Sequence, residues 1–106
     1  MCSRKIIPTV DTIVVAMCLD YKRRERAIRE RSVTKRTDTE YRYLNYMIYD
    51  AAAEIIGERD AVTMVNEIGR RTGYAKTALD NLSEITYKSY KRLIMDNVAK
   101  KLHLVD

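Results

Sequence analysis

Apolar side chains recur at alternating steps of three and four residues through the middle of the chain. The positions that form this stripe are Tyr41, Leu44, Ile48, Ala51 and Ile55. Such spacing places one apolar face along an α-helix and leaves the other faces to polar residues. Thr37 and Glu40 have the spacing of a capping box at the start of this segment, and Gly57 follows its end as a C-terminal cap. The pattern predicts an amphipathic helix over residues 38–56.

The same periodicity predicts further helices over residues 10–31, 60–72 and 84–102, and a short helix or turn over 75–82. At the start of the first, Pro8 is followed by Thr9 or Asp11, either of which can accept an unpaired backbone N–H. Arg24 occupies one position of its apolar stripe. The other expected end signals are Asp60 and Ser83 as N-caps and Gly73 as a terminator.

The chain has 106 residues, with only three glycines and one proline. That length suits one domain, and so few glycines and prolines leave little punctuation for the turns of an all-β fold. We therefore expect a single all-α domain, a bundle of four to five helices in which 10–31 and 38–56 pack as two long antiparallel helices. The short helix 75–82, a turn near Ser83 and the last helix would form a C-terminal helix-turn-helix-like unit.

The first half of the helix predicted over 10–31 is apolar nearly all round. A small bundle cannot bury so many apolar faces, so we expect a homodimer. Asp11 and Asp20 make the apolar run too short and too interrupted for a membrane span, so no membrane partner is expected. The two cysteines, Cys2 and Cys18, form neither a zinc-binding set nor a disulfide framework, which is typical of a reduced cytoplasmic protein.

The sequence offers little for catalysis. His103 is the only histidine and lies near the C-terminus, so it lacks partners for a Cys–His or metal-binding arrangement. The three glycines follow predicted helices and do not form a phosphate-binding loop after a strand. Asp50 and Glu54 share a helix face, where solvated carboxylates are commoner than a paired acid and base. We expect a protein that is not an enzyme and has no cofactor or metal site.

Charge is distributed in zones along the chain. Residues 22–36 contain eight basic and two acidic residues, whereas residues 37–87 contain five basic and nine acidic ones. Residues 88–106 contain five basic and two acidic residues, and residues 1–21 balance to zero. Two basic zones therefore flank an acidic middle, which suggests a polyanionic partner or the two halves of a self-association surface.

Within the first basic zone, Arg23, Arg26 and Arg29 fall along one side of the predicted helix. A DNA backbone would favour such a row, because each neutralised phosphate releases counterions. The alternative is a solvated helix end in which Glu25 pairs with Arg29, and Arg26 with Glu30, at i,i+4 spacing. The sequence supports the two interpretations about equally.

In the last predicted helix, Lys88, Lys91 and Arg92 share one side, and Thr86 and Ser89 lie in the first turns. The first turns of a recognition helix are the part that enters the major groove of duplex DNA. These five residues are therefore candidate DNA contacts. The interpretation requires the cationic flank to face outward, free of carboxylates from the same chain.

All eight aromatic residues are tyrosines, and four of them, Tyr41, Tyr43, Tyr46 and Tyr49, fall in the helix predicted over 38–56. Nucleic-acid bases can stack on tyrosine. Tyrosine also closes cores and interfaces whose edge stays wet, and a core or oligomer contact is the favoured interpretation here.

The segment "ITYKSYKRLIMDNVAKKLHL", residues 85–104, resembles the C-terminal signature of the ArpU/RinA-type phage transcriptional regulators, a region itself similar to the promoter-binding C-terminal domain of sigma factors. The residues that match the signature are Thr86, Tyr87, Lys88, Lys91, Arg92, Val98, Ala99 and Leu102. The segment before it, "IGRRTGYAKTALDNLSE", departs from the family's "EIAxxLGIS" scaffold helix and its glycine turn. The resemblance implies a prophage-type transcriptional regulator that binds double-stranded DNA, with RNA polymerase as a further candidate partner.

A second hypothesis belongs to a different class. The chain would be a non-enzymatic helical interaction or assembly protein, a homodimer without nucleic-acid contact. The acidic middle of one copy would then face a basic end of another, with the tyrosines lining the contact.

Overall fold

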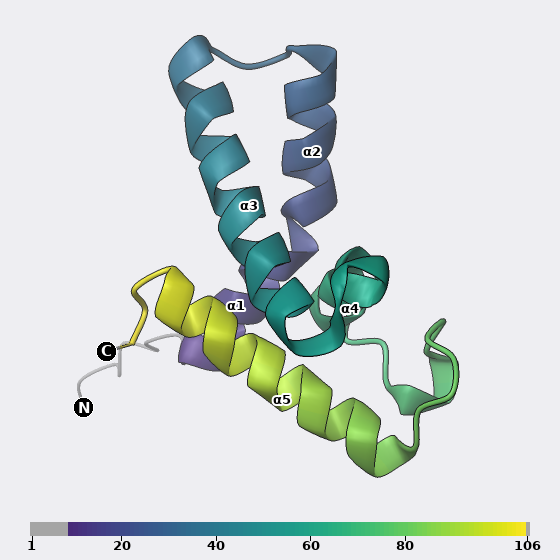
Figure 1. Cartoon of the computed structure of the whole chain (residues 1–106). Helices are drawn as coiled ribbons and strands as arrows, with labels where there is room; N and C mark the ends of the chain where they lie inside the picture. The colour runs from purple at the N-terminus through teal and green to yellow at the C-terminus, as the bar shows by residue number, and fades with distance from the viewer. Residues whose placement is uncertain (1–8, 106) are drawn as a thin grey trace, which may run out of the picture.

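A computed structural model describes residues 9–105. These residues form five α-helices, one 3₁₀-helix and their connections, with no strand among them (Figure 1). The elements are α1 (Val10–Leu19), α2 (Tyr21–Glu30), α3 (Lys35–Ile56), α4 (Glu58–Arg70), the 3₁₀-helix η1 (Tyr74–Lys76) and α5 (Glu84–Lys101). The predicted all-α helical bundle is confirmed.

The prediction of one continuous helix over 10–31 is wrong, because the chain turns at Asp20 between α1 and α2. The guanidinium of Arg24 donates a hydrogen bond of 2.6 Å to the backbone oxygen of Met17. In a continuous helix that oxygen would accept the N–H of Tyr21, four residues on. The side chain of Arg24 therefore replaces a helical donor at the break.

This break divides the first of the two predicted long helices, whereas α3 is a single helix of 22 residues. The short α2 runs antiparallel beside the first half of α3, and α1 lies across the base of the pair (Figure 1). α2, the loop and the first half of α3, residues 21–45, project from the rest of the molecule as a hairpin, which we call the α2–α3 hairpin (Figure 1).

The start of α3 lies three residues before the predicted one. Thr34 is its N-cap, with Oγ1 accepting the backbone N–H of Thr37 at 3.3 Å. The capping box expected at Thr37 and Glu40 is wrong, because α3 already begins one turn earlier and Thr37 lies inside its first turn. Gly57 ends α3 as predicted, with a φ of 92°. Since α4 begins at the next residue, Asp60 lies inside its first turn and is not the N-cap.

Two other predicted caps are confirmed. Thr9 accepts the backbone N–H of Thr12 at 3.2 Å, and Ser83 accepts that of Thr86 at 3.1 Å. Pro8, which was expected to precede the first cap, lies outside the described residues. The remaining helix ends close without glycine: the residues in the left-handed conformation after α2, α4 and α5 are Arg31, Arg71 and His103. The terminator of α4 is therefore Arg71 and not the predicted Gly73.

The predicted helix 75–82 is not formed, since only η1 makes a single helical turn between α4 and α5. The carboxylate of Glu67 organises this connection. It accepts hydrogen bonds from Thr77 Oγ1 at 2.6 Å, from the backbone N of Ala78 at 2.8 Å and from Tyr87 Oη at 2.9 Å. Because the N–H of Ala78 bonds this carboxylate, it is not available to a helix. The expected helix-turn-helix-like unit thus lacks its first helix, and residues 71–83 are longer than the three or four residues of its turn.

The core lies where α1, α4 and α5 meet the second half of α3. Its fully buried side chains include Val14, Ile48, Met64, Val65, Ile94 and Val98. Gly69, inside α4, allows α1 to approach closely, since a Cβ there would lie 2.4 Å from the backbone N of Leu19. None of the helices in residues 9–105 combines the length and the apolar content that crossing a membrane requires.

Candidate functional site

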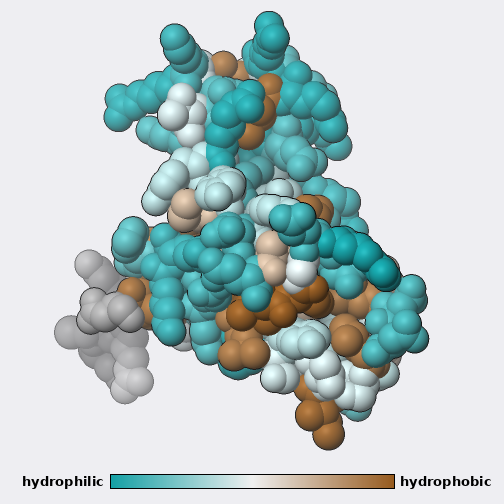
Figure 2. Space-filling view, in the orientation of Figure 1, coloured by the Kyte–Doolittle hydropathy of each residue, from teal (hydrophilic) through white to brown (hydrophobic). Residues whose placement is uncertain are grey.

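The formal charge of the protein is concentrated in the α2–α3 hairpin. Residues 22–42 contain nine basic and four acidic residues, whereas the remainder of the chain contains eleven of each. The net charge of +5 is therefore the charge of this segment. Figure 2 shows hydrophilic residues over most of the projecting part, while hydrophobic residues gather nearer the base. The cationic surface lies at one end of the molecule.

Four cations around the end of the hairpin are exposed and have no carboxylate within ion-pair distance in residues 9–105: Arg26, Arg29, Arg31 and Lys35. The Glu25–Arg29 and Arg26–Glu30 pairs of the alternative interpretation are not formed among these residues. Charges without an intramolecular partner are the ones available to an external anion. Of the predicted backbone contacts, Arg26 and Arg29 therefore have the expected geometry.

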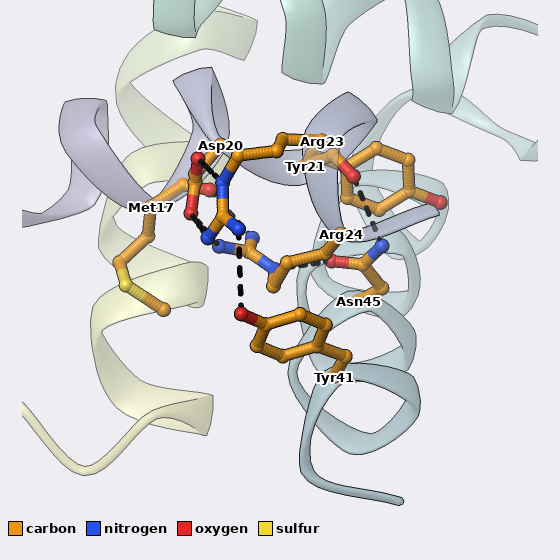
Figure 3. A network of polar contacts seen from close by, with 7 residues as sticks. All are labelled: Met17, Asp20, Tyr21, Arg23, Arg24, Tyr41 and Asn45. Carbon is orange, nitrogen blue, oxygen red and sulfur yellow. Dashed lines mark hydrogen bonds and ion pairs between the residues drawn. The ribbon is translucent and has the colours of Figure 1, made fainter. Parts of the chain in front are cut away.

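Arg23, the third predicted contact of this row, is engaged within the chain (Figure 3). Its guanidinium donates to both carboxylate oxygens of Asp20 and, at 3.3 Å, to the hydroxyl of Tyr41. It also lies 5.5 Å from the centroid of the Tyr41 ring, a cation–π geometry. The hydrogen bonds from Arg23 hold the pKa of Asp20 below its ordinary value. Arg23 therefore joins the turn at Asp20 to α3 and stabilises the base of the hairpin.

Arg24 lies beside it and is 2% exposed, which makes it a buried cation between α2 and α3. Its Nε donates to Asn45 Oδ1 at 2.7 Å, and Asn45 in turn donates to the backbone oxygen of Tyr21 at 3.1 Å (Figure 3). Asp20 lies 3.4 Å from another of its nitrogens. A buried charge is tolerated only when it is paired and hydrogen-bonded, and this network meets that condition. The direction in which the hairpin projects is therefore set by specific bonds.

The expected free cationic flank of α5 is wrong for two of its three residues. Lys88 Nζ lies 3.1 Å from Glu84 Oε1 on the preceding turn. Arg92 donates to both oxygens of Asp11 at 2.8 Å and to Asp96 at 2.6 Å. The hydrogen bonds from Arg92 lower the pKa of Asp11. These carboxylates neutralise part of the surface that was expected to enter a DNA groove.

The other predicted contacts of α5 are divided. Thr86 is half-buried, and its hydroxyl lies 2.9 Å from that of the cap residue Ser83. Ser89 is exposed, and Lys91 is half-buried without an ion pair in the described part of the chain. The outward face of this helix also carries Ile85, which is 83% exposed. The face is consequently less cationic than its sequence suggested.

The tyrosines of α3 also divide between core and surface. Tyr49 is partly buried against the core, whereas Tyr43 and Tyr46 are 51% and 59% exposed. Beside Tyr43 lies a largely apolar cleft of roughly 260 Å³, whose other lining residues are Ile13, Met17, Leu44, Leu102, His103 and Leu104. The cleft and the exposed tyrosine rings therefore form a second surface, which is apolar where that of the hairpin is cationic.

Asp50 and Glu54 take part in a contact between two helices. Both carboxylates bind Lys101 Nζ, at 2.9 and 2.8 Å, which joins α3 to the end of α5. Asn97 adds a bond of 2.8 Å to Glu54. The hydrogen bond from Lys101 is the main cause of the lowered pKa of Glu54.

Cys18 is buried in the core, where burial raises the pKa of its thiol to about 12. At neutral pH the thiol is therefore protonated and a poor nucleophile. Cys2 lies outside the described residues.

Sequence reasoning did not single out Arg31 and Lys35, although both belong to the basic stretch 22–36. The available signal was their position, with Arg31 directly before the aperiodic segment "SVTKR" and Lys35 within it. A loop between two antiparallel helices must lie at the end of the pair, so its cations project furthest.

No family model, curated protein or solved structure matches this chain.

Proposed function

We propose that this protein binds double-stranded DNA, with the α2–α3 hairpin as its main contact to the phosphate backbone. The observation that carries the proposal is that the entire net charge belongs to a projecting hairpin, while the remainder of the chain is neutral. A basic surface confined to one face is the electrostatic footprint of a nucleic-acid-binding protein.

The side chains that support the proposal most directly are exposed cations that have no ion pair within residues 9–105: Arg26, Arg29, Arg31 and Lys35. Each phosphate that they neutralise would release condensed counterions into solution. Four such contacts correspond to a slope of about −3.6 in the logarithm of affinity against the logarithm of salt concentration. This is a large and easily measured dependence.

The hairpin favours backbone contact over base reading. One α-helix with its side chains is about 10–12 Å across, close to the width of the major groove. Two helices side by side exceed that width, so the end of the hairpin would rest across the phosphates. Binding through this surface should therefore depend weakly on DNA sequence.

In this proposal α5 takes a secondary part. Its resemblance to the ArpU/RinA-type signature is the basis for proposing transcriptional regulation in a prophage setting, with RNA polymerase as a further partner. Ser89 is exposed and Lys91 has no ion pair within residues 9–105, which supports some DNA contact there. The ion pairs of Lys88 and Arg92 are exposed, and such pairs contribute only about 0–1 kcal/mol, so DNA could displace them.

Fluorescence anisotropy with a labelled random duplex, at 50 and 200 mM salt, tests the proposal. The wild-type protein should bind, and its affinity should fall steeply with salt. Arg26→Gln/Arg29→Gln should weaken binding and reduce the salt slope by about 1.8. Lys88→Ala/Lys91→Ala/Arg92→Ala is the matched set on α5 and should have the smaller effect per charge removed.

Circular dichroism must show that both sets of variants remain folded. Absence of duplex binding by the wild type at low salt would refute the proposal. If only the α5 variants lose affinity, the hairpin is not the principal contact.

A second candidate function is self-association as a helical assembly protein. The exposed rings of Tyr43 and Tyr46 beside the apolar cleft favour it, since tyrosine is enriched at interfaces. Sedimentation analysis of the wild type and of Tyr43→Ser/Tyr46→Ser separates the two functions. A wild-type dimer that the double variant dissociates, together with no affinity for DNA, would favour assembly.

A further inference from the structure

A second basic feature lies at the base of the hairpin, in a cleft of roughly 330 Å³ between α2, α4 and the connection that follows α4. Three cations from these three segments line it: Lys22, Arg70 and Lys76. All three are exposed, and none has a carboxylate within ion-pair distance in residues 9–105. Cations that converge from separate segments without a partner require either solvent or a bound anion to offset their repulsion.

The walls of the cleft add neutral hydrogen-bonding groups to these charges. The polar residues are Thr63, Asn66 and Thr72, each of them half-buried. Hydroxyl and amide groups beside Arg and Lys are the usual partners of phosphate oxygens, and the planar guanidinium can bind two such oxygens at once. The lining is therefore typical of a site for a compact oxyanion with several acceptor oxygens.

Glu67 is the one carboxylate that lines the cleft. It is 7% exposed, and its two oxygens already accept hydrogen bonds from Thr77, Ala78 and Tyr87. The Glu67 carboxylate therefore holds the segment after α4 that forms one wall of the cleft, and its oxygens point to donors within the chain. With three cations and this one anion, the lining retains a net positive charge.

The end of α4 contributes a partial negative charge from its helix dipole, which Arg70 in the last turn offsets. The backbone N–H groups of Arg71 and Thr72 already satisfy the oxygens of Ile68 and Glu67. These two carbonyl oxygens at the end of α4 are therefore hydrogen-bonded, and they do not present unpaired acceptors that would repel an anion.

We infer that this cleft binds a phosphate group. The inference rests on the proposed DNA binding for the source of that phosphate, which would belong to the backbone of the same duplex. Lys22 supports this connection, because it begins a row on α2 that continues at i+4 and i+7 with Arg26 and Arg29. Seven helical residues span about 10.5 Å, comparable to the rise of about three base pairs along the DNA axis, at roughly 3.4 Å each. One backbone could thus contact the hairpin and enter the cleft.

Titration of ¹⁵N-labelled protein with inorganic phosphate at constant ionic strength tests the site without DNA. The amide signals of Thr63, Asn66 and Thr72 should shift together and give one millimolar dissociation constant. Lys22→Gln/Lys76→Gln should raise that constant at least about tenfold. The control Lys100→Gln removes an exposed cation elsewhere, on α5, and should leave the constant unchanged within about twofold.

Absence of shifts at the cleft, or an unchanged constant in the double variant, would overturn the phosphate site. A duplex titration with the same variants then tests the source of the phosphate. If the cleft receives a DNA phosphate, Lys22→Gln/Lys76→Gln lowers the salt slope by about 1 to 2 relative to Lys100→Gln. An unchanged slope, with phosphate binding lost, would overturn the assignment to DNA. Failure of the proposed function is distinguishable, since the wild type would then bind phosphate but no duplex.

Discussion

Replacement of Gly69 by alanine is the most direct test of how the helices of this protein pack. Gly69 lies inside α4, where it faces the end of α1. A Cβ at this position would lie 2.4 Å from the backbone N of Leu19, 2.5 Å from its Cα and 2.8 Å from the carbonyl carbon of Cys18. All three are backbone atoms, so no side-chain rotation can relieve the collision.

The size of the effect follows from the displacement that is needed. An ordinary contact begins near 3.4 Å, so α1 would have to move away from α4 by about 1 Å. A gap of that size forfeits roughly a quarter to a half of the dispersion energy at each separated contact. Overpacking costs about 1–3 kcal/mol, and a collision with backbone belongs at the upper end of that range. Alanine recovers about 1 kcal/mol through its higher helix propensity. We expect a net destabilisation of about 2 kcal/mol.

Urea denaturation followed by circular dichroism measures this change, and thermal unfolding should show a decrease in Tm of about 8–16 °C. Gly73→Ala is the matched control. It lies outside the helices, a Cβ added there would meet nothing within 4 Å, and its φ is negative. Its stability should stay within about 0.5–1 kcal/mol of the wild type. If Gly69→Ala were as stable as the wild type, or more stable as helix propensity alone predicts, the close crossing of α1 and α4 would be refuted.

Three further predictions concern buried charge, helix ends and pH. Arg24→Lys should destabilise the protein by about 2–4 kcal/mol in urea denaturation, because an ammonium group lacks the planar fork that reaches Asn45 and the α1 carbonyl together; an unchanged midpoint would contradict this. His103→Gly should stabilise the protein by about 1 kcal/mol, since its φ of 58° suits glycine; a loss of stability would show that the imidazole makes a compensating contact. The pKa values of Asp11 and Asp20 are lowered by their arginine partners from an ordinary 3.8, so the unfolded state binds more protons in acid. The free energy of unfolding should therefore be level above about pH 5 and fall below about pH 4, and Asp20→Asn should reduce the difference between pH 7 and pH 3.

Much of the helical architecture could be predicted from the sequence, because helices depend on neighbours within one or two turns. The periodic stripe from Tyr41 to Ile55 predicted most of α3, and Gly57 marked its end correctly. Ser83 likewise predicted the start of α5, since its side chain needs only the N–H three residues on. The predicted start of α3 was wrong because Thr34 and Thr37 are both suitable N-cap residues by these local rules, and Thr34 occupies the position.

The candidate site was predictable only in part. The basic zone of residues 22–36 was visible as composition, and two of its predicted contacts, Arg26 and Arg29, are exposed and have no ion pair among residues 9–105. Whether a cation is free depends on residues far away in the chain. Arg92 is bound by Asp11, eighty-one residues earlier, and no local pattern relates the two.

The sequence by itself determined most of the helical segments and that the positive charge is unevenly spread along the chain. Tertiary structure decided where the first helix breaks, how closely α1 crosses α4 at Gly69, and that Glu67 binds Thr77 and Ala78 in the connection where a helix was predicted. The physical reason is range. Periodicity and caps depend on residues three or four positions apart in the sequence. The contacts of the Arg24 guanidinium, of Gly69 and of the Glu67 carboxylate depend instead on residues that become neighbours only in the folded protein.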